Sequence, residues 1–238
     1  MKKEAGHTFL AKLGKKRLRP GGRKATDWLI KKGHFTKDKR VLEVGCNMCT
    51  TAIQLAKTYG CNIEGVDLNA KALQQGQKNV EAASLSHLIH VQKANAMNLP
   101  FEDEQFDIIL NEAMLTMLPL KAKVQALREY YRVLKPGGML LTHDIAIINL
   151  AQKEEIVENL SSAINVKVTP LPTAEWYQLF KDSRFSQIES HIGELTLMTP
   201  AGMLYDEGLF GTMKIVKNAL KKENRNMFFT MFRTMKRY

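Results

Sequence analysis

The stretch from residue 40 to residue 143 alternates short aliphatic runs with helical stretches, and this alternation constrains the fold more than any other feature of the chain. Runs typical of strands occur at 40–44, 62–67, 88–92, 106–110 and 139–143. Helical patterns occupy 50–59, 69–83, where Asn69 is a suitable N-cap, and 121–134. Strands that alternate with helices build parallel βαβ units. The pattern predicts an α/β fold with a doubly wound, mostly parallel sheet.

Helical additions are expected at both ends of this sheet. The sequence indicates helices at 152–164, 173–180, 200–222 and 224–238, a sixth strand at 186–191, and a weak candidate for a seventh strand at 195–198. The methionines and phenylalanines of residues 199–238 are interpreted as helix-packing residues. We expect one domain over 1–238, made of a basic arm (1–36), a core (38–145) and a C-terminal part (146–238) whose helices lie on the substrate side.

The net charge of +11 is unevenly distributed. Residues 1–40 have a balance of +11 and residues 214–238 a balance of +7, whereas residues 41–213 have a balance of −7. Basic ends of this kind are either solvated helical faces or surfaces that attract phosphates, an anionic membrane surface or an acidic substrate. A peripheral membrane contact through the basic ends therefore stays open at this point.

Composition and the N-terminal residues point to the cytoplasm. The apolar share of 45% is ordinary for a globular protein, and no apolar run approaches the roughly 20 residues that a membrane helix needs. The first residues lack the continuous apolar segment of a signal peptide. Three cysteines, an odd number, favour a reducing compartment.

The loop after the first expected strand is the first candidate for a ligand site, because open parallel sheets bind ligands outside the carboxyl ends of their strands. Gly45 allows the backbone to approach a ligand, and a helix begins a few residues later. Asp67 closes the second strand, 22 positions after Gly45, where a carboxylate accepts hydrogen bonds from ribose hydroxyls. The pattern predicts a site for a nucleoside cofactor.

Three residues near this loop favour a cofactor without phosphates. A dinucleotide site wants glycine at three positions, but Asn47 and Cys49 stand in the later ones. Glu43, inside the first strand, repels phosphates and attracts an ammonium group. A ligand with an adenosine and an amino-acid end fits better, and S-adenosylmethionine is such a ligand.

Four segments in this order resemble the class I S-adenosylmethionine-dependent methyltransferases, particularly the small-molecule group related to quinone biosynthesis: VLEVGCNMCT, GVDLNA, ANAMNLPFEDEQFDIILNEAML and VLKPGGMLLT. The resemblance covers residues 38–145 and continues weakly through 173–185. It implies a methyltransferase with a Rossmann-like fold that uses S-adenosylmethionine and releases S-adenosylhomocysteine. It also implies cofactor contacts at the methionine end by Glu43, Gly45, Cys46, Asn47 and Asn111, at the ribose by Asp67, and at the adenine by Leu68, Asn95 and Ala96.

Other functions remain as alternatives. The glycine-poor loop is compatible with a non-catalytic protein that binds an S-adenosyl ligand, and a dinucleotide-dependent oxidoreductase is a third candidate. The Cys46–Cys49 pair lacks a second pair of ligands, so no metal site is expected. No catalytic residue is assigned, although Glu112, His143 and Asp144 lie where a base is possible; each also suits a structural role.

The acceptor is expected to be a small molecule. Relatives that methylate base amino groups carry Asn/Asp-Pro-Pro-aromatic after the fourth strand, whereas this chain has Asn111 followed by Glu-Ala-Met, so an RNA acceptor is the less favoured alternative. Specificity is expected from the basic arm around 17–24 and from the helices of 199–238. Basic side chains there suggest an anionic acceptor. The oligomeric state has no signal in the sequence.

Overall fold

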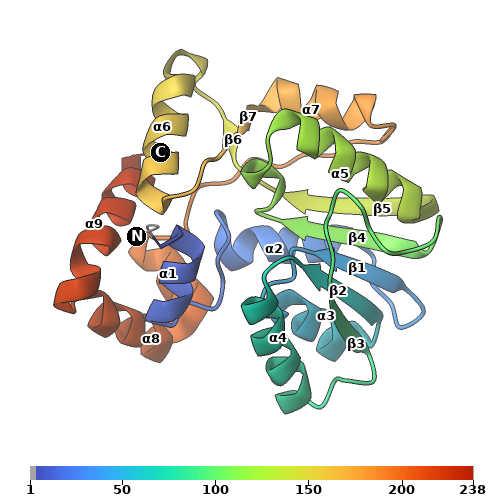
Figure 1. The fold of residues 1–238 in the computed structure, drawn as a ribbon, viewed down its shortest axis with the longest axis horizontal. Coiled ribbons are helices and arrows are strands. Elements are labelled where there is room, and N and C mark those ends of the chain that lie inside the picture. The colour runs from blue at the N-terminus through green and yellow to red at the C-terminus, as the bar shows by residue number, and fades with distance from the viewer. Residues whose placement is uncertain (1–3, 238) are drawn as a thin grey trace.

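The computed structural model describes residues 4–237, and its centre is a five-stranded parallel sheet with the strand order β3-β2-β1-β4-β5 (Figure 1). The strands are β1 (Arg40–Val44), β2 (Asn62–Asp67), β3 (Ile89–Lys93), β4 (Phe106–Glu112) and β5 (Leu134–His143). The predicted doubly wound fold is confirmed. Strand β5 begins earlier than predicted because Leu134 already pairs with Phe106, ahead of a shift in register.

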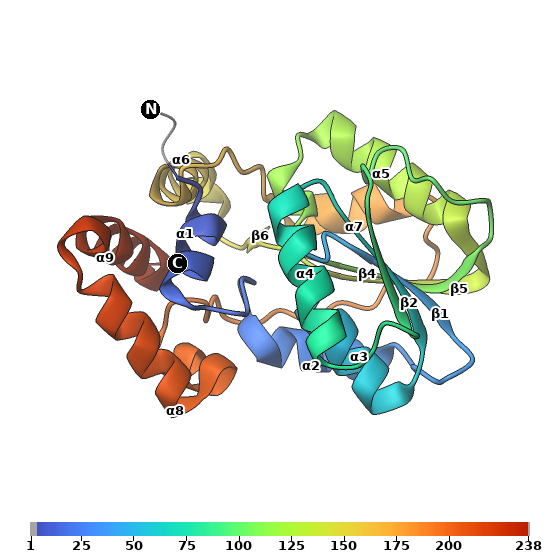
Figure 2. The same cartoon turned by 60° about the horizontal axis from the view of Figure 1, so that its bottom comes forward.

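Helices cover both faces of the sheet (Figure 2). One face packs against α2 (Gly22–Lys32), α3 (Thr50–Tyr59) and α4 (Ala70–Ala82), and the other against α5 (Leu120–Val133) and α7 (Thr173–Asp182). Neighbouring strand residues alternate between the two cores, as Val41 and Leu42 do. Because both faces are buried, the central strands are almost continuously apolar, which is why they were recognisable in the sequence.

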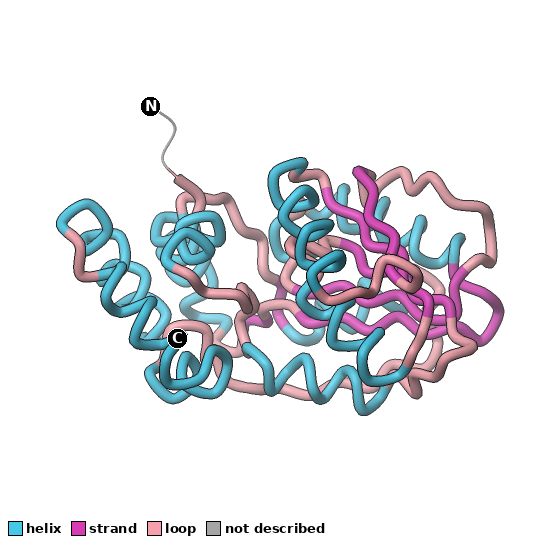
Figure 3. The backbone as a smooth tube through the Cα atoms, turned by 90° about the horizontal axis from the view of Figure 1, so that it is seen from below, coloured by secondary structure: helices cyan, strands magenta, loops and turns pink. Residues whose placement is uncertain are grey.

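A cluster of helices lies beside the sheet (Figure 3). It consists of α1 (Gly6–Leu13), α6 (Lys153–Ile164), α8 (Pro200–Ala219) and α9 (Lys222–Arg237). Met203, Phe228 and Met231 are buried there, as the helix-packing interpretation predicted. For Phe210 and Met213 that interpretation is wrong, because their side chains are 86% and 59% exposed.

The predicted sixth strand at 186–191 is wrong, because this segment has no regular secondary structure. Its side chains are held by α2 instead: Glu189 forms an ion pair with Lys32, and the His191 ring stacks on Trp28 at 5.4 Å between centroids. Ile192 remains 60% exposed, so the segment gains little apolar burial that would draw it onto the sheet.

The weak seventh-strand candidate at 195–198 is also irregular. The backbone N–H groups of Thr196 and Leu197 donate to the Pro20 carbonyl, each at 2.9 Å, so this segment holds the N-terminal arm. Two short strands that the sequence did not indicate, β6 (Ala146–Ile147) and β7 (Leu171–Pro172), pair in parallel as a separate sheet. Single turns of 3-10 helix occur at Leu115–Met117 and Leu150–Gln152. None of the helices within 4–237 is both long and apolar enough to cross a membrane.

Two carboxylates of α8 fasten the N-terminal arm. Lys15 Nζ lies 3.1 Å from Asp206 Oδ2 and 3.6 Å from Glu207 Oε1, and all three side chains are almost fully buried. The backbone N–H of Arg17 donates to Glu207 at 3.0 Å, and that of Arg23 to Asp206 at 2.7 Å. These contacts fix the path of residues 15–23 across the molecule.

Lys15→Met should therefore destabilise the protein by about 3–5 kcal/mol, because it leaves two buried carboxylates without their cation. Urea unfolding followed by circular dichroism measures this change. Lys12→Met is the matched control, since the Lys12 side chain is 58% exposed and its pair with Glu4 spans 3.8 Å. Equal losses of stability in both variants would contradict the assignment of Lys15 as an anchor.

Candidate functional site

The loop after β1 bends toward the end of β2. The N–H groups of Gly45 and Cys46 both donate to the Val66 carbonyl, at 2.8 and 3.0 Å. Gly45 has φ of +75°, and an added Cβ would come within 3.4 Å of Met114. A glycine is needed here because the left-handed conformation strains other residues. The bend exposes backbone next to the carboxyl ends of β1 and β4.

Asp67 joins this loop to the loop after β2. Its Oδ2 accepts a hydrogen bond from Asn47 N at 3.0 Å, and its Oδ1 accepts one from Asn69 N at 2.8 Å. The carboxylate is thereby oriented at the end of β2, half-buried. The neighbouring Leu68 side chain is 59% exposed, which leaves an apolar surface beside the carboxylate. A carboxylate next to an apolar surface suits a ribose that carries a base.

Arg19 of the N-terminal arm lies between two buried carboxylates. Its Nη1 is 2.7 Å from Glu112 Oε1 at the end of β4, and its Nη2 is 3.8 Å from Glu43 Oε1 in β1. Thr26 accepts a hydrogen bond from Arg19 Nη1 at 2.9 Å and donates one to Glu112 Oε2 at 2.6 Å. The site thus holds one fixed positive charge beside two carboxyl groups.

The two carboxyl groups differ in ionisation. Burial raises the pKa of Glu43 to about 8, opposed by the charge of Arg19 and the N–H of Ala52. Burial acts on Glu112 in the same direction, but Arg19, His143 and Thr26 together hold the pKa of Glu112 below its ordinary value. At neutral pH, Glu112 is therefore the ionised partner of Arg19, and Glu43 is largely protonated.

Sequence reasoning placed Arg19 in the basic arm but missed its position in this site. His7 of α1 was missed as well: burial lowers the pKa of His7, while the charge of Asp67, which lies nearby, acts to raise it. No spacing in the sequence relates His7 or Arg19 to the loop after β1, because both come from the arm that crosses the carboxyl end of the sheet. Their basic character was the only available signal.

The asparagines that the resemblance implicates have different surroundings. Asn111 is fully buried at the end of β4, where its Nδ2 donates to the Val44 carbonyl at 3.1 Å and its Oδ1 has no hydrogen-bond partner. Asn95 Oδ1 instead accepts from Met97 N at 3.0 Å and so caps its own turn. Ala96, which follows it, is 9% exposed. Asn111 is therefore the residue with an unused acceptor beside the loop after β1.

The two cysteines of this loop point into the core. Cys46 and Cys49 are 2% and 0% exposed, and the hydrogen bond between their thiols, together with burial, raises the pKa of Cys46. A Cβ on Gly76 of α4 would lie 2.8 Å from Cys49 Sγ, so this glycine lets α4 pack onto the loop. Only the backbone of Cys46 remains for a ligand. Residues 4–237 contain no cluster of three metal-ligating side chains.

The three residues considered as bases lie in two environments. His143 Nε2 accepts a hydrogen bond from Gly21 N at 3.2 Å, and its Nδ1 lies 3.7 Å from Glu112 Oε2. Asp144 is buried, which raises its pKa, and its Oδ1 accepts from Thr116 N at 2.7 Å. Asp144 thus fixes the 3-10 turn Leu115–Met117 itself, whereas His143 lies between the site and a neighbouring cavity.

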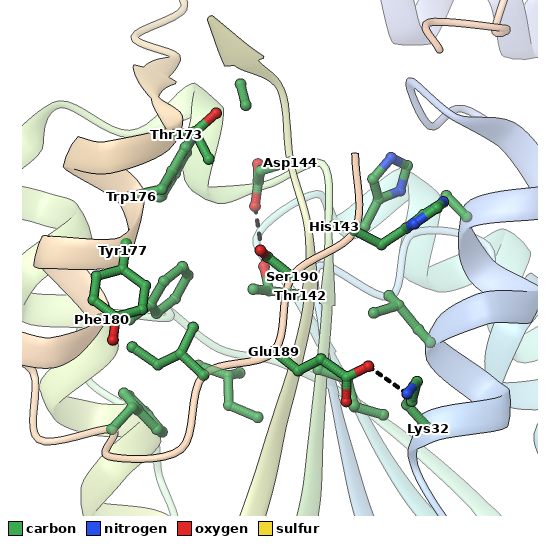
Figure 4. A pocket seen from close by; sticks show the side chains of 18 of the residues that line it. Lys32, Thr142, His143, Asp144, Thr173, Trp176, Tyr177, Phe180, Glu189 and Ser190 are labelled. Carbon is green, nitrogen blue, oxygen red and sulfur yellow. Dashed lines mark hydrogen bonds and ion pairs between the residues drawn. The ribbon is translucent and has the colours of Figure 1, made fainter. Parts of the chain in front are cut away.

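That cavity, which we call the β5 groove, has a volume of about 2530 Å³ and runs along the open edge of β5 (Figure 4). Trp176, Tyr177 and Phe180 of α7 form one wall, and Trp28 of α2 belongs to the other. Thr142, His143 and Asp144, at the carboxyl end of β5, are among its polar lining residues, which also include charged side chains such as Lys32 and Glu189. The groove occupies the side of β5 where a sixth strand was predicted. His143 connects it to the Glu112–Arg19 pair.

Comparison with known proteins identifies the family of this fold. A family model described as a methyltransferase domain matches residues 41–138. An uncharacterized protein of Haemophilus influenzae is 60% identical over 98% of this chain and 92% of its own. A demethylmenaquinone methyltransferase of Lactiplantibacillus plantarum is 36% identical over 45% of this chain and 46% of its own. The structure of a geranyl diphosphate methyltransferase in complex with SAM covers 90% of this chain and 79% of its own, with a TM-score of 0.67 and 16% identity, which shows a shared fold.

The chain belongs to the class I S-adenosylmethionine-dependent methyltransferases, as the four sequence segments suggested. It is therefore an enzyme with S-adenosylmethionine as its cofactor, and the non-catalytic and oxidoreductase alternatives are set aside. The residues fit this cofactor, because Asp67 suits a ribose, and Arg19 and Glu43 together can meet the carboxylate and ammonium groups of an amino acid once Glu43 is ionised. The chain spans about half the length of the named methyltransferase it matches.

Proposed function

We propose that this enzyme transfers the methyl group of S-adenosylmethionine to a small molecule with an apolar or aromatic body, bound in the β5 groove. The observation that carries the proposal is the junction at His143, which lines the groove and lies 3.7 Å from Glu112 of the cofactor site. The groove is larger than the roughly 300–1,000 Å³ of a usual small-molecule pocket, so a small molecule would fill only the part of it between the aromatic side chains of α7 and His143.

Recognition of the cofactor is divided among three places. Asp67 would accept hydrogen bonds from the ribose hydroxyls, and Leu68 would cover one side of the base. Gly45 exposes its backbone for close approach, and Asn111, whose buried Oδ1 has no hydrogen-bond partner, lies beside this loop at the end of β4. Arg19 offers a positive charge to the carboxylate of the amino-acid end, and Glu43 offers a negative charge to the ammonium once binding has ionised it.

The chemistry is an in-line displacement. When bound, the cofactor supplies a methyl group on a positively charged sulfur; the acceptor atom forms the new bond to carbon, and the sulfur keeps the electron pair of the broken bond. The enzyme contributes positioning and the exclusion of water. Where the acceptor loses a proton, His143 is the titratable side chain between the groove and Glu112; Nε2 would take the proton only after releasing its hydrogen bond from Gly21 N.

The arginines of the arm do not supply an anion site within the groove. Arg19 is engaged by Glu112 and Thr26, Arg17 donates to Gln54 at 3.1 Å, and Arg23 pairs with Asp27 at 3.3 Å. Basic side chains that do line the groove, such as Lys24, Lys31 and Arg128, leave an anionic acceptor as an alternative to one recognised by its apolar body. The three cysteines are free and buried, which suits a reaction in the cytoplasm.

Calorimetric titration with S-adenosylmethionine, S-adenosylhomocysteine and NAD tests the cofactor site. We expect micromolar binding of the first two and none of NAD. Asp67→Ala should weaken the binding of S-adenosylmethionine and of S-adenosylhomocysteine by at least tenfold, because hydrogen bonds to a charged group contribute about 1.5–3 kcal/mol. Asp38→Ala, which removes an exposed carboxylate at the opposite end of β1, is the matched control.

Acceptor classes are compared by the release of S-adenosylhomocysteine in the presence of hydroxylated aromatic compounds or of total RNA. Turnover with the aromatic compounds, lost when Trp176 is replaced by alanine, supports the groove as the acceptor site. NAD binding as tight as that of S-adenosylmethionine would overturn the cofactor assignment, and turnover with RNA alone would overturn the small-molecule assignment.

A further inference from the structure

The second half of α8 presents apolar side chains to the solvent. The helix breaks at Gly208, whose φ of 70° and ψ of 177° are not helical, and the segment 209–219 then continues as a separate helical stretch. Phe210 is 86% exposed, Leu209 61%, Met213 59%, Leu220 56% and Val216 39%. Five large exposed apolar side chains within twelve positions exceed the scattered apolar residues of an ordinary surface.

Four of these residues form one stripe. At about 100° per residue, Leu209, Met213, Val216 and Leu220 fall within about 60° of one another around the helix axis. Ile215 and Ala219 lie about 90–130° from the centre of this stripe, where they are buried against α1 and α9. The segment 209–220 therefore has two apolar faces. One belongs to the core of the protein, and the other, which we call the α8 stripe, faces outward.

Lysines border the α8 stripe on one side. On the same helical projection, Lys217 and Lys214 lie about 70–130° from the centre of the stripe, with Phe210 between, and Lys221 follows at its end. All three lysines are exposed, and no carboxylate among residues 4–237 forms an ion pair with them. The only acidic residue in 214–238 is Glu223, against eight basic residues.

An apolar stripe bordered by unpaired lysines matches the two layers of an anionic bilayer surface. Apolar side chains enter the boundary between head groups and acyl chains, while lysines contact lipid phosphates. A second copy of this chain fits less well, since two such surfaces would bring the lysines together. RNA pairs with the lysines but leaves the stripe exposed to water.

We propose that the α8 stripe and its lysines attach this enzyme reversibly to anionic membrane surfaces. The attachment uses a surface of the helical cluster, remote in sequence from the residues that contact the cofactor. Asp206 and Glu207, in the first part of α8, hold the N-terminal arm. The break at Gly208 allows the helical segment 209–220 to run in a different direction from that first part.

Co-sedimentation of the full chain with vesicles tests the proposal. We expect binding to vesicles of phosphatidylcholine with 40% phosphatidylglycerol, and at least tenfold weaker binding to phosphatidylcholine alone. Replacing Lys214, Lys217 and Lys221 with glutamate should weaken binding to the anionic vesicles by about 100-fold, since each basic residue near the surface contributes about 1 kcal/mol. Replacing Lys37, Lys57 and Lys78 with glutamate makes the same change in charge elsewhere and should leave binding within threefold.

A second variant isolates the stripe. Replacing Leu209, Phe210 and Met213 with glutamine keeps the charge and should also weaken vesicle binding at least tenfold, with unchanged thermal unfolding and unchanged affinity for S-adenosylmethionine. Binding to anionic vesicles that neither set of α8 substitutions reduces would overturn the proposal. It would also be overturned by a dimer in light scattering that the glutamine variant dissociates, or by binding to an RNA oligonucleotide but not to vesicles.

Discussion

Arg19→Met should lower the affinity for S-adenosylmethionine by about 1000-fold. The Arg19 guanidinium lies 2.7 Å from Glu112 and 3.8 Å from Glu43, and the three side chains are nearly inaccessible to water. Removing the cation from a buried ion pair lowers the free energy of unfolding by about 3–5 kcal/mol. It also removes the positive charge that we assign to the carboxylate of the cofactor. Calorimetry measures the affinity, and thermal unfolding measures the accompanying loss of stability.

A shorter ligand separates the two effects of this substitution. Methylthioadenosine has the adenosine but lacks the charged amino-acid end, so its affinity for a folded Arg19→Met protein should stay within about threefold of wild type. Arg23→Met is the matched control, because the Arg23 side chain is 47% exposed and pairs with Asp27 on the same helix. If the affinities for S-adenosylmethionine and methylthioadenosine fell equally, Arg19 would affect binding only by stabilising the folded protein.

Glu43 should make cofactor binding depend on pH. Burial raises the pKa of Glu43 to about 8 in the free protein. The positive charges of the cofactor favour the ionised carboxylate, so the pKa of Glu43 falls on binding and a proton is released. Affinity should then rise by up to about tenfold per pH unit as the pH approaches 8 from below, and level off above it. Calorimetry in buffers of different ionisation enthalpy counts the released protons.

Glu43→Gln should flatten this profile and weaken binding by about 100-fold at pH 8. The same variant should be more stable than wild type near pH 8. Folding raises the pKa of this carboxyl group from about 4.5 to about 8, so the unfolded chain ionises first. The free energy of unfolding of wild type therefore falls as the pH rises through this range, and the glutamine variant avoids that fall. Glu64→Gln in β2 is the control. A pH profile identical in wild type and Glu43→Gln would contradict the role of Glu43.

Much of the sheet was predictable because each element carried a local signal. Asn69 accepts hydrogen bonds from the N–H groups of Lys71 and Ala72, as an N-cap does. The sixth strand failed because 186–191 has strand-like composition, whereas its position depends on Lys32 and Trp28, which lie far away in the sequence. The prediction that Phe210 and Met213 pack between helices was wrong for a related reason. The spacing of apolar residues shows that a helix has an apolar face, but it does not show which face packs against the rest of the protein.

The sequence by itself predicted the strands of a doubly wound fold, the loop at Gly45 after the first of them, and the acidic residue Asp67 at the end of the second. These depend on glycine conformation, strand burial and short spacings, all of which are local. Only the tertiary structure decided that Arg19 lies between Glu43 and Glu112, and that an open groove runs along β5. The first feature arises where the N-terminal arm crosses the carboxyl end of the sheet, and the second where α2, α7 and residues 186–196 surround the edge of β5. Contacts across nearly 200 residues of chain, such as Lys15 with Asp206, leave no periodic trace in the sequence.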